Sequence, residues 1–323
     1  MVKCRTVIVF EFVFLVTVFF IILNFYPNIL HNDKPNGLLA PGVYAGVYES
    51  KTYQTDNFVP FGDELNYYIE QNKLNISIHI RSLKSGNSID VNENLQFYPL
   101  SLAKLPLAVL IMHKIEKKQL SLDTEVAIKD EDRMDTYGDL YKTDEKVFTI
   151  KYLLEKMLKE SDNTAFNILI RQVNEDDLNV LISYYSVDLN PYYNARRVNK
   201  HPGLMTAKIM SNVLVSLYTS SILDIKNSEY ILSLLEETVF NIQKLAKLSD
   251  DVKIVHKFGS NYLNNNKFFH DCGIIYFPNE RVLYCIMTKD LAEEDAADVV
   301  AAIVNRIYIN NVITETQAQQ YRR

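Results

Sequence analysis

The chain has 323 residues, of which 48% are hydrophobic and 23% are charged. That amount of apolar material is enough for the core of one sizeable globular domain, or of two at most. The formal net charge of −6 argues against a nucleic-acid partner, which would require a concentrated basic face.

The first segment of the chain is strongly apolar. Residues 6–24 contain a single charged side chain, Glu11, and follow the positive residues Lys3 and Arg5. A helix of this length crosses the ~30 Å hydrocarbon core of a bilayer, and the preceding positive charges predict that the rest of the chain lies outside the cytoplasm. A cleaved signal peptide and a buried core helix are the alternatives, but no small-x-small cleavage site closely follows the run. We therefore expect residues 1–31 to be an uncleaved single-pass anchor in the cell membrane.

The next part of the chain combines a spacer, a hairpin and several helices. Residues 32–60 are rich in Gly, Pro, Asn and Tyr and are predicted to be a spacer. Residues 74–80 alternate apolar and polar side chains as a half-buried strand does, residues 84–87 form a turn, and residues 88–91 start the return strand. The following helical stretches are expected at 101–113, 149–172 and 205–248, the last as two or three helices.

Strand patterns return near the C-terminal end, at residues 252–257, 268–277 and 281–288, and a last amphipathic helix is expected at 292–307. Strands at both ends of the chain with helices between them predict one antiparallel sheet flanked by helices, with an inserted α-helical region. That is an α+β architecture. We expect residues 61–315 to form this domain and residues 316–323 to be a polar tail.

The chain contains three cysteines. Cys4 lies on the inner side of the expected anchor and cannot pair with the other two. Cys272 and Cys285 flank a turn symmetrically, so in a two-residue hairpin they would face each other across the strands. We favour a pair of buried thiols that pack as small hydrophobes, with a disulfide as the alternative. No C-x-x-C pattern or zinc-type His/Cys spacing occurs, and no metal or cofactor is expected.

Ser101 is the candidate nucleophile, and Lys104 follows it three residues later on a predicted helix. A serine hydroxyl attacks poorly unless a base removes its proton. Residues i and i+3 of a helix share a face, which brings the Lys104 amine near the Ser101 hydroxyl. Burial beside a second cation lowers the pKa of a lysine, so a neutral amine can accept the proton. No other serine in the chain has a lysine three residues further on.

A second polar motif, Ser161-Asp162-Asn163, lies sixty residues after Ser101. Taken alone, such a tripeptide is compatible with a simple helix cap. Near a nucleophile, however, the Ser161 hydroxyl can relay a proton to a leaving nitrogen, and Asn163 can hydrogen-bond a substrate amide.

A third motif, Lys257-Phe258-Gly259-Ser260, lies on the predicted strand that would edge the site. Gly259 lets the strand backbone approach an acyl group closely. The run Lys84-Ser85-Gly86 has a similar pattern, but it precedes the nucleophile and is predicted to be a turn.

The three motifs and their order resemble those of class A β-lactamases and penicillin-binding proteins, the serine DD-peptidase-like superfamily, whose signature is Ser-x-x-Lys, Ser-Asp-Asn and Lys-Thr-Gly. The approach to the nucleophile, residues 94–106, and the last strand pair, residues 270–288, are similar as well. The resemblance covers roughly residues 67–312 in the same order. It implies the fold of these enzymes and an acyl-serine chemistry.

The resemblance also implies a role for each motif residue. Ser101 would accept the acyl group and Lys104 would act as its base. Ser161 would pass a proton to the leaving group, and Lys257 would be the fixed cation that holds a substrate carboxylate and tunes Ser161. The amides of Ser101 and Ser260 would form the oxyanion hole.

Two departures from the family pattern concern turnover and substrate. Class A β-lactamases carry a glutamate on the loop after the second motif, but residues 188–206 contain none. Asp188 lies at the mouth of this loop and is not expected to replace the glutamate. We interpret His201, also on the loop, as structural or solvated. Phe258 stands where the family has a hydroxyl that helps to bind the substrate carboxylate. It would narrow the site or select a different acyl donor. Both departures leave acylation in place and weaken the case for fast β-lactam turnover.

Three functions follow from the sequence. The leading one is a membrane-anchored acyl-serine enzyme that acts through Ser101 on a small-molecule or peptidoglycan-peptide substrate, with the membrane as partner through residues 6–24. The second is a true β-lactamase with slow deacylation. The third is a catalytically silent binding domain that has kept the pocket, and Phe258 is its main support.

Overall fold

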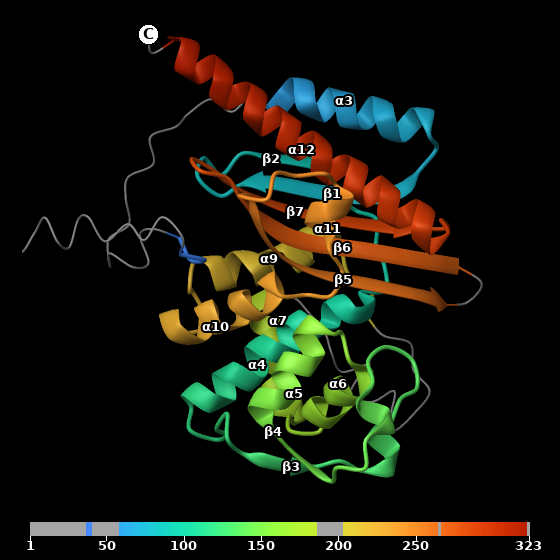
Figure 1. The fold of residues 1–323 in the computed structure, drawn as a ribbon, viewed down its shortest axis with the longest axis vertical. Helices are drawn as coiled ribbons and strands as arrows, with labels where there is room; N and C mark the ends of the chain where they lie inside the picture. The colour runs from blue at the N-terminus through green and yellow to red at the C-terminus, as the bar shows by residue number, and fades with distance from the viewer. Residues whose placement is uncertain (1–36, 41–57, 186–202, 264–265, 322–323) are drawn as a thin grey trace, which may run out of the picture.

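The computed structural model describes residues 37–40, 58–185, 203–263 and 266–321. Its centre is a five-stranded antiparallel sheet in the order β2-β1-β7-β6-β5. The strands are β1 (Asn75–Ser82), β2 (Ser88–Val91), β5 (Lys253–Leu263), β6 (Asn266–Tyr276) and β7 (Arg281–Lys289). The first strand pairs with the last along its whole length, from Asn75 opposite Lys289 to Ser82 opposite Val282. The prediction that strands from both ends of the chain share one sheet is therefore confirmed (Figure 1).

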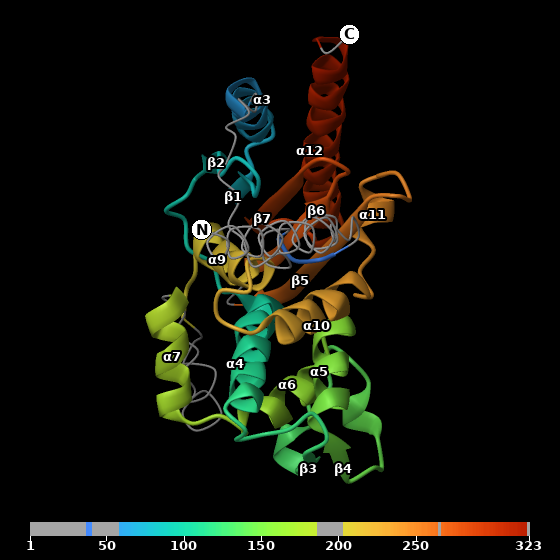
Figure 2. The ribbon, with the colours of Figure 1, turned by 90° about the vertical axis from the view of Figure 1, so that its left-hand side faces the viewer.

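Helices cover both faces of the sheet (Figures 1 and 2). Helices α3 (Phe58–Gln71) and α12 (Glu293–Tyr321) lie on one face, and α9 (Ala207–Tyr218) packs against the other. Beyond α9 lies the helical region, with α4 (Lys104–Glu116), α5 (Ile150–Lys159), α6 (Asn163–Ile170), α7 (Glu175–Tyr185), α10 (Ile225–Glu236) and a small sheet of β3 (Glu125–Ala127) and β4 (Val147–Thr149). The short helix α11 (Ile242–Leu245) leads into β5. Each face of the sheet has its own apolar core.

The helix predicted over 149–172 is interrupted, because α5 ends at Lys159 and α6 begins at Asn163. Ser161, between them, has a φ of 57°, a left-handed conformation that costs a non-glycine residue roughly 1 kcal/mol or more. Asp162 caps α6 by accepting a hydrogen bond from the amide of Ala165. The apolar spacing continues through both helices, which is why the sequence pattern did not reveal the break. The interruption turns the backbone of Ser161 toward α4.

Helix α4 is a core helix. Its first nine residues, 104–112, are all buried, so it is surrounded by apolar neighbours rather than lying at the surface. Lys104 is the first of these nine and is 2% exposed. The same burial that stabilises α4 therefore places a lysine amine in a medium of low polarity.

The two cysteines of the β6–β7 hairpin lie directly opposite each other, as the turn symmetry predicts. They form a disulfide, Cys272–Cys285. The interpretation of this pair as buried free thiols is therefore wrong. Register alone brings the two sulfur atoms together, and both residues are fully buried, so spacing along the chain did not distinguish the two states.

Residues 37–40, within the predicted spacer, pack against the domain. Leu38 belongs to the apolar core between the sheet and the helical region, and its carbonyl accepts a hydrogen bond of 2.6 Å from the Tyr276 hydroxyl. The amide of Ala40 donates to the carbonyl of Tyr218 at 2.7 Å. These contacts fix this short segment beside α9 and β6.

Three predicted segments lie wholly or mostly outside the described residues: the anchor at 6–24, the spacer at 32–60 except for 37–40 and 58–60, and residues 188–202 of the loop that lacks a glutamate, including Asp188 and His201. Within the described ranges, none of the helices combines the length and the apolar character that crossing a membrane requires. Helix α12 extends to Tyr321, well past the predicted end of the last helix at residue 307.

Candidate active site

The candidate nucleophile lies on a short 3-10 helix, η1 (Leu100–Ala103), which continues directly into α4. The predicted helical stretch therefore starts with a 3-10 turn. This turn still places residues i and i+3 on one side, and Lys104 Nζ lies 3.0 Å from Ser101 Oγ. Ser101 is partly exposed, whereas Lys104 is buried. A hydroxyl reachable from solvent thus sits against an amine that solvent does not reach.

Lys104 Nζ has four oxygen atoms within hydrogen-bond distance. Two belong to the hydroxyls of Ser101, at 3.0 Å, and Ser161, at 3.1 Å; two are carbonyl oxygens, Ser161 O at 2.6 Å and Asn163 Oδ1 at 2.7 Å. A carbonyl oxygen accepts hydrogen bonds and cannot donate them. A neutral amine has two N–H donors, which these two carbonyls take. Its lone pair is then left facing the serine hydroxyls, as a general base requires.

The electrostatic setting of Lys104 favours that neutral amine. Burial lowers the pKa of Lys104 well below its ordinary value of 10.5, and the positive charge of Lys257 lowers it further, while Asp162 acts in the opposite direction. Desolvation disfavours the charged form of a lysine, and a neighbouring cation adds to this effect. The expected lowering of the Lys104 pKa by burial and by a second cation is therefore present.

The Ser161–Asn163 motif meets Lys104 through the backbone break between α5 and α6. Asn163 is the first residue of α6, and its Nδ2 donates to Thr136 Oγ1 at 2.6 Å while its Oδ1 accepts from Lys104. Asp162 accepts hydrogen bonds from the amides of Ala165 and Leu140. Asp162 is therefore structural, and the two residues on either side of it reach the site.

The edge strand β5 forms the other wall. A Cβ atom on Gly259 would lie 2.9 Å from the amide nitrogen of Ser101 and 3.1 Å from Leu100 Cβ. Only a glycine allows this approach, since real Cβ atoms do not come so close to a neighbouring backbone nitrogen. Gly259 therefore lies against the backbone of the nucleophile, on the strand that was predicted to edge the site, and the next residue, Ser260, is partly exposed.

Lys257 is fully buried and donates a hydrogen bond of 3.1 Å to the carbonyl of Phe258. Burial lowers the pKa of Lys257 to about 7, and the negative charge of Asp271 opposes this lowering. Lys257 is close enough to Lys104 for its charge to act there, but no hydrogen bond joins Lys257 to either serine in the described part of the chain. The structure therefore brings Ser101, Lys104, Ser161 and Asn163 into one hydrogen-bonded group and leaves Lys257 beside it.

Phe258 points into the core under α12 rather than toward the nucleophile. It is 4% exposed, and its ring centroid lies 5.2 Å from that of Phe240 and 5.8 Å from that of Tyr137. Lys257 Nζ lies 4.5 Å from the centre of the Phe258 ring, a cation–π distance. The ring is therefore a packing neighbour of the site.

Sequence reasoning missed Tyr137, which borders the site from the loop before η3 (Leu140–Lys142). Its hydroxyl donates to Glu293 at the start of α12, at 3.2 Å, and also interacts with Ser260. Burial, first, and the Glu293 charge raise the Tyr137 pKa to about 12, so the phenol stays protonated. The local feature of the sequence that marks this loop is Gly138, which follows Tyr137. Gly138 has a φ of 89°, and a Cβ atom at this position would clash with Asp162.

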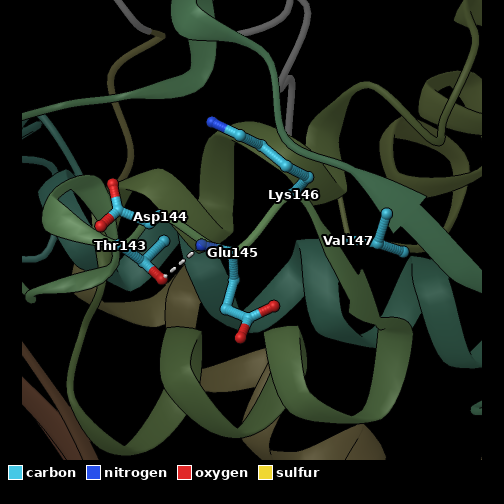
Figure 3. A pocket seen from close by; sticks show the side chains of 5 residues that line it. All are labelled: Thr143, Asp144, Glu145, Lys146 and Val147. Atoms are coloured by element: carbon cyan, nitrogen blue, oxygen red, sulfur yellow. Dashed lines mark hydrogen bonds between the residues drawn. The ribbon is translucent and has the colours of Figure 1, made fainter.

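Two other features of the surface do not belong to this site. Residues 84–86 lie in the β1–β2 turn, where Gly86 has a φ of 85°, as predicted for this literal Lys-Ser-Gly run. A hollow lined by residues 143–147 lies between η3 and β4 (Figure 3), at the end of the helical region away from the sheet (Figure 1). Its side chains point apart, and the only hydrogen bond drawn among them joins the Glu145 amide to Thr143 Oγ1.

The chain is similar to known proteins in sequence and in fold. The model of the "Beta-lactamase enzyme family" (Beta-lactamase2) matches residues 60–310, most of the chain. Among curated proteins, the beta-lactamase VEB-1 of Pseudomonas aeruginosa is 22% identical over 279 residues, which cover 80% of this chain and 92% of VEB-1. A beta-lactamase of Bacteroides uniformis is 24% identical over 246 residues, 69% of this chain and 82% of that protein.

Solved structures show the same fold. A variant of PBP-A, solved as an acyl-enzyme complex with penicillin G, superimposes with a TM-score of 0.68 over 81% of this chain and 98% of that one, at 18% identity. The TLA-1 extended-spectrum beta-lactamase superimposes with a TM-score of 0.68 over 78% and 98%, at 21% identity. The α+β fold predicted from the strand and helix order is therefore confirmed.

Proposed function

The chain belongs to the beta-lactamase enzyme family, a family of serine hydrolases, and from this premise we propose that it transfers the acyl group of a cell-wall peptide or a β-lactam to Ser101. The observation that carries the proposal is the hydrogen bonding of Lys104. Two carbonyl oxygens hold the amine with its lone pair toward Ser101 and Ser161, and burial favours the neutral form that can take a proton.

In the proposed acylation, Ser101 Oγ attacks the carbonyl carbon of the substrate amide. The new Oγ–C bond forms, the C–N bond breaks, and the Ser101 proton passes to Lys104 Nζ. Lys104 then returns a proton through the Ser161 hydroxyl to the leaving nitrogen, so the lysine ends neutral again. The amides of Ser101 and Ser260 stabilise the oxyanion, because Gly259 lets β5 approach the nucleophile.

The remaining roles concern substrate binding. Asn163 Nδ2 faces the partly exposed side of the group and suits a substrate carbonyl oxygen. Lys257 supplies a buried positive charge beside the nucleophile for an anionic substrate. Phe258 contributes indirectly, because its ring packs against the Lys257 amine.

The acyl-enzyme is proposed to be long-lived. Residues 188–206 contain no glutamate, the residue type that activates the deacylating water in the class A β-lactamases that the chain resembles. We therefore favour a penicillin-binding, transpeptidase-like protein as the first candidate. A slow β-lactamase is the second candidate, favoured by the two curated relatives, both of which are beta-lactamases.

Intact-protein mass spectrometry of the full-length chain after addition of penicillin G tests both candidates. A stoichiometric adduct on Ser101 that persists for hours supports the transpeptidase-like reading, and release with consumption of many equivalents supports the β-lactamase. Ser101→Ala abolishes the adduct, whereas Ser88→Ala, which removes an exposed hydroxyl on β2, keeps it. A wild-type chain that gains no adduct from penicillin G or from an activated thioester contradicts acyl transfer.

We also propose that residues 6–24 anchor the protein in the membrane with the domain on the outer side. The apolar length of the segment and the preceding Lys3 and Arg5 support this. In membranes from expressing cells, the full chain is expected to resist alkaline carbonate extraction, and a chain lacking residues 1–31 is expected to be released. Release of both chains contradicts the anchor.

A further inference from the structure

A buried histidine on β6 contacts the segment that leads into the nucleophile. His270 Nε2 lies 2.9 Å from the carbonyl oxygen of Tyr98, a residue shortly before Ser101 in the chain. The imidazole is fully buried, and the rings of Phe97 and Phe268 lie edge-on to it, at centroid distances of 5.6 and 6.1 Å. The proposed acylation steps do not use His270, and none of the three sequence motifs contains it.

His270 lies directly behind the strand that approaches the nucleophile. It pairs in register with Gly259 of β5, and residues paired across neighbouring strands share one face of the sheet. A Cβ atom on Gly259 would lie 2.9 Å from the Ser101 amide nitrogen, so this face is the one that carries η1. Two adjacent strands therefore hold the backbone around the nucleophile, β5 by close packing and β6 by a hydrogen bond.

The contacts of the His270 ring favour one tautomer. A carbonyl oxygen accepts hydrogen bonds and cannot donate them, so the bond to Tyr98 requires a proton on Nε2. Burial lowers the pKa of His270 to about 4, so the ring is neutral near neutral pH and Nδ1 carries no proton. Nδ1 then accepts from the Thr288 amide at 3.2 Å. The carbonyl of Phe269, 2.7 Å from Nδ1, has another donor in the Thr288 hydroxyl, at 2.8 Å.

The segment that His270 contacts includes a left-handed residue next to the nucleophile. Leu100 has a φ of 53°, a conformation that a non-glycine residue keeps only where its surroundings impose it. Before Leu100, the Tyr98 carbonyl is bound by His270. After it, Ser101 Oγ is hydrogen-bonded to Lys104 Nζ at 3.0 Å. The bond from β6 therefore fixes one end of the turn on which Ser101 lies.

The same segment has a second anchor that does not involve His270. The backbones of Phe97 and Met205 exchange two hydrogen bonds of 2.9 Å, and Met205 lies just before α9. Loss of the His270 bond alone is therefore expected to move the segment rather than to release it, so variants of His270 can be examined as folded proteins.

We propose that His270 is a positioning residue of the active site, whose Nε2–H holds the Tyr98 carbonyl and thereby sets the position of the Ser101 hydroxyl and amide. The effect on acylation rests on the proposed function. The tautomer of the ring and the placement of the Ser101 backbone do not depend on it.

The direct test is 1H–15N NMR of the histidine rings in the full-length chain, solubilised in mild detergent. The chain has six histidines, and His270→Gln assigns the resonances of this one. Near neutral pH the wild-type ring is expected to be neutral and protonated at Nε2. A ring that is protonated at Nδ1, or at both nitrogens, overturns the inference.

Two substitutions of similar size separate the hydrogen bond from the filling of the core. His270→Gln keeps an N–H donor at about the reach of Nε2, whereas His270→Met fills a similar volume without a donor. Acylation of Ser101 by penicillin G is expected to stay close to the wild-type rate in the glutamine variant and to fall by about 10²-fold in the methionine variant, the cost of a displaced reacting group. The fall is expected in the covalent step, with the noncovalent affinity for penicillin G unchanged.

The matched control is His79→Met, which removes another buried histidine from the same sheet. His79 lies on β1 beside Asp90, and β7 separates β1 from β6, so this variant is expected to be acylated like the wild type. Equal rates in folded His270→Gln and His270→Met overturn the inference, since a side chain that only fills the core needs no donor. If His270→Met does not fold, His270→Asn, whose amide is too short to reach Tyr98, takes its place.

A wild type that is acylated neither by penicillin G nor by a thioester contradicts the proposed function but leaves this inference open to test. The Ser101 amide resonance then replaces the rate. It is expected to move further from its wild-type position in His270→Met than in His270→Gln, and equal displacement in the two variants contradicts the positioning role.

Discussion

Lys104 Nζ lies 2.6 Å from the carbonyl oxygen of Ser161, closer than it lies to the hydroxyl of either Ser101 or Ser161. The base is thus held by the backbone of the residue whose side chain is proposed to relay the proton. That backbone is left-handed, with a φ of 57°. The carbonyl of Ser161 thus positions the base, and its hydroxyl is proposed to relay the proton. Substitutions can separate these two roles.

Substitution of Ser161 separates them. Ser161→Ala keeps the carbonyl and removes the hydroxyl, so acylation by penicillin is expected to slow by about a hundredfold or more, in the range of a lost proton-transfer group. Ser161→Gly loses the same hydroxyl but suits the left-handed backbone, and should be more stable than Ser161→Ala by about 1 kcal/mol. Acylation kinetics and urea unfolding of both variants check this. Equal stability of the two would argue that the backbone at residue 161 is unstrained.

Lys104→Arg places a permanent cation within reach of the same carbonyls. An arginine cannot lose its proton in a protein, so the variant is expected to lack a base and to be acylated between about 10² and 10⁴ times more slowly. Formation of the adduct is followed by mass spectrometry of samples quenched at successive times. The pH is about neutral, where the base is needed. The control is Lys114→Arg, on the same helix near its other end, which should react like the wild type. An unchanged rate for Lys104→Arg would assign the base elsewhere.

Stability should depend on pH through Lys257. Its pKa is about 7 in the folded protein, against an ordinary value of 10.5. Between these values the unfolded chain binds more protons than the folded chain, so the free energy of unfolding rises with pH, by about 1.4 kcal/mol per unit for one group at most. Below pH 7 both states are protonated and the contribution stays at its lowest. Urea unfolding of the wild type and of Lys257→Met should show the wild type gaining relative stability from pH 7 to pH 10; a constant difference between them would contradict the lowered pKa.

Gly259→Ala tests the approach of β5 to the nucleophile. Its Cβ would lie 2.9 Å from the Ser101 amide nitrogen, so the strand must shift and the oxyanion hole with it. Acylation should fall by about 10²-fold or more, as for a lost oxyanion donor, with about 1–3 kcal/mol of stability lost to overpacking. At Gly62 a Cβ would meet only the Ile89 side chain, at 3.7 Å, and because Gly62 lies in helix α3, Gly62→Ala should be neutral or stabilising. Wild-type kinetics for Gly259→Ala would mean that β5 does not complete the site.

The disulfide predicts a thiol count. The chain has three cysteines, and the pair Cys272–Cys285 is bonded, so the unfolded, unreduced protein should react with one equivalent of thiol reagent at Cys4. After reduction the count should rise to three. The double variant Cys272→Ser/Cys285→Ser should keep the single reactive thiol and lose about 2–4 kcal/mol of stability. Three reactive thiols before reduction would contradict the bond.

The sequence was sufficient for the hydrogen-bonded group of the site. Ser101 and Lys104 are three residues apart, and helical geometry alone joins them. The order of strands along the chain predicted one sheet with its ends together, and β1 does pair with β7. These features follow from spacing and periodicity, which a single sequence displays.

Other features depend on contacts that spacing does not encode. The break at Ser161 has no glycine or proline to mark it, since the left-handed turn is held by Lys104 from another helix. Tyr137 borders the site only through the packing of the loop before η3. The hairpin predicts that Cys272 and Cys285 lie opposite each other across the strands. It does not predict whether their sulfur atoms are bonded.

The pairing of β1 with β7 has a consequence for how the chain comes to be folded. Asn75 and Lys289 are hydrogen-bonded neighbours across a sheet, yet almost the whole domain is synthesised between them. Contacts so distant along the chain form late and slowly, and until β7 is made, β1 presents an unpaired edge open to aggregation. The strand β5, which lies against the nucleophile on η1, is also made long after it, so labelling of Ser101 by a penicillin is expected only once β5 has been synthesised and packed.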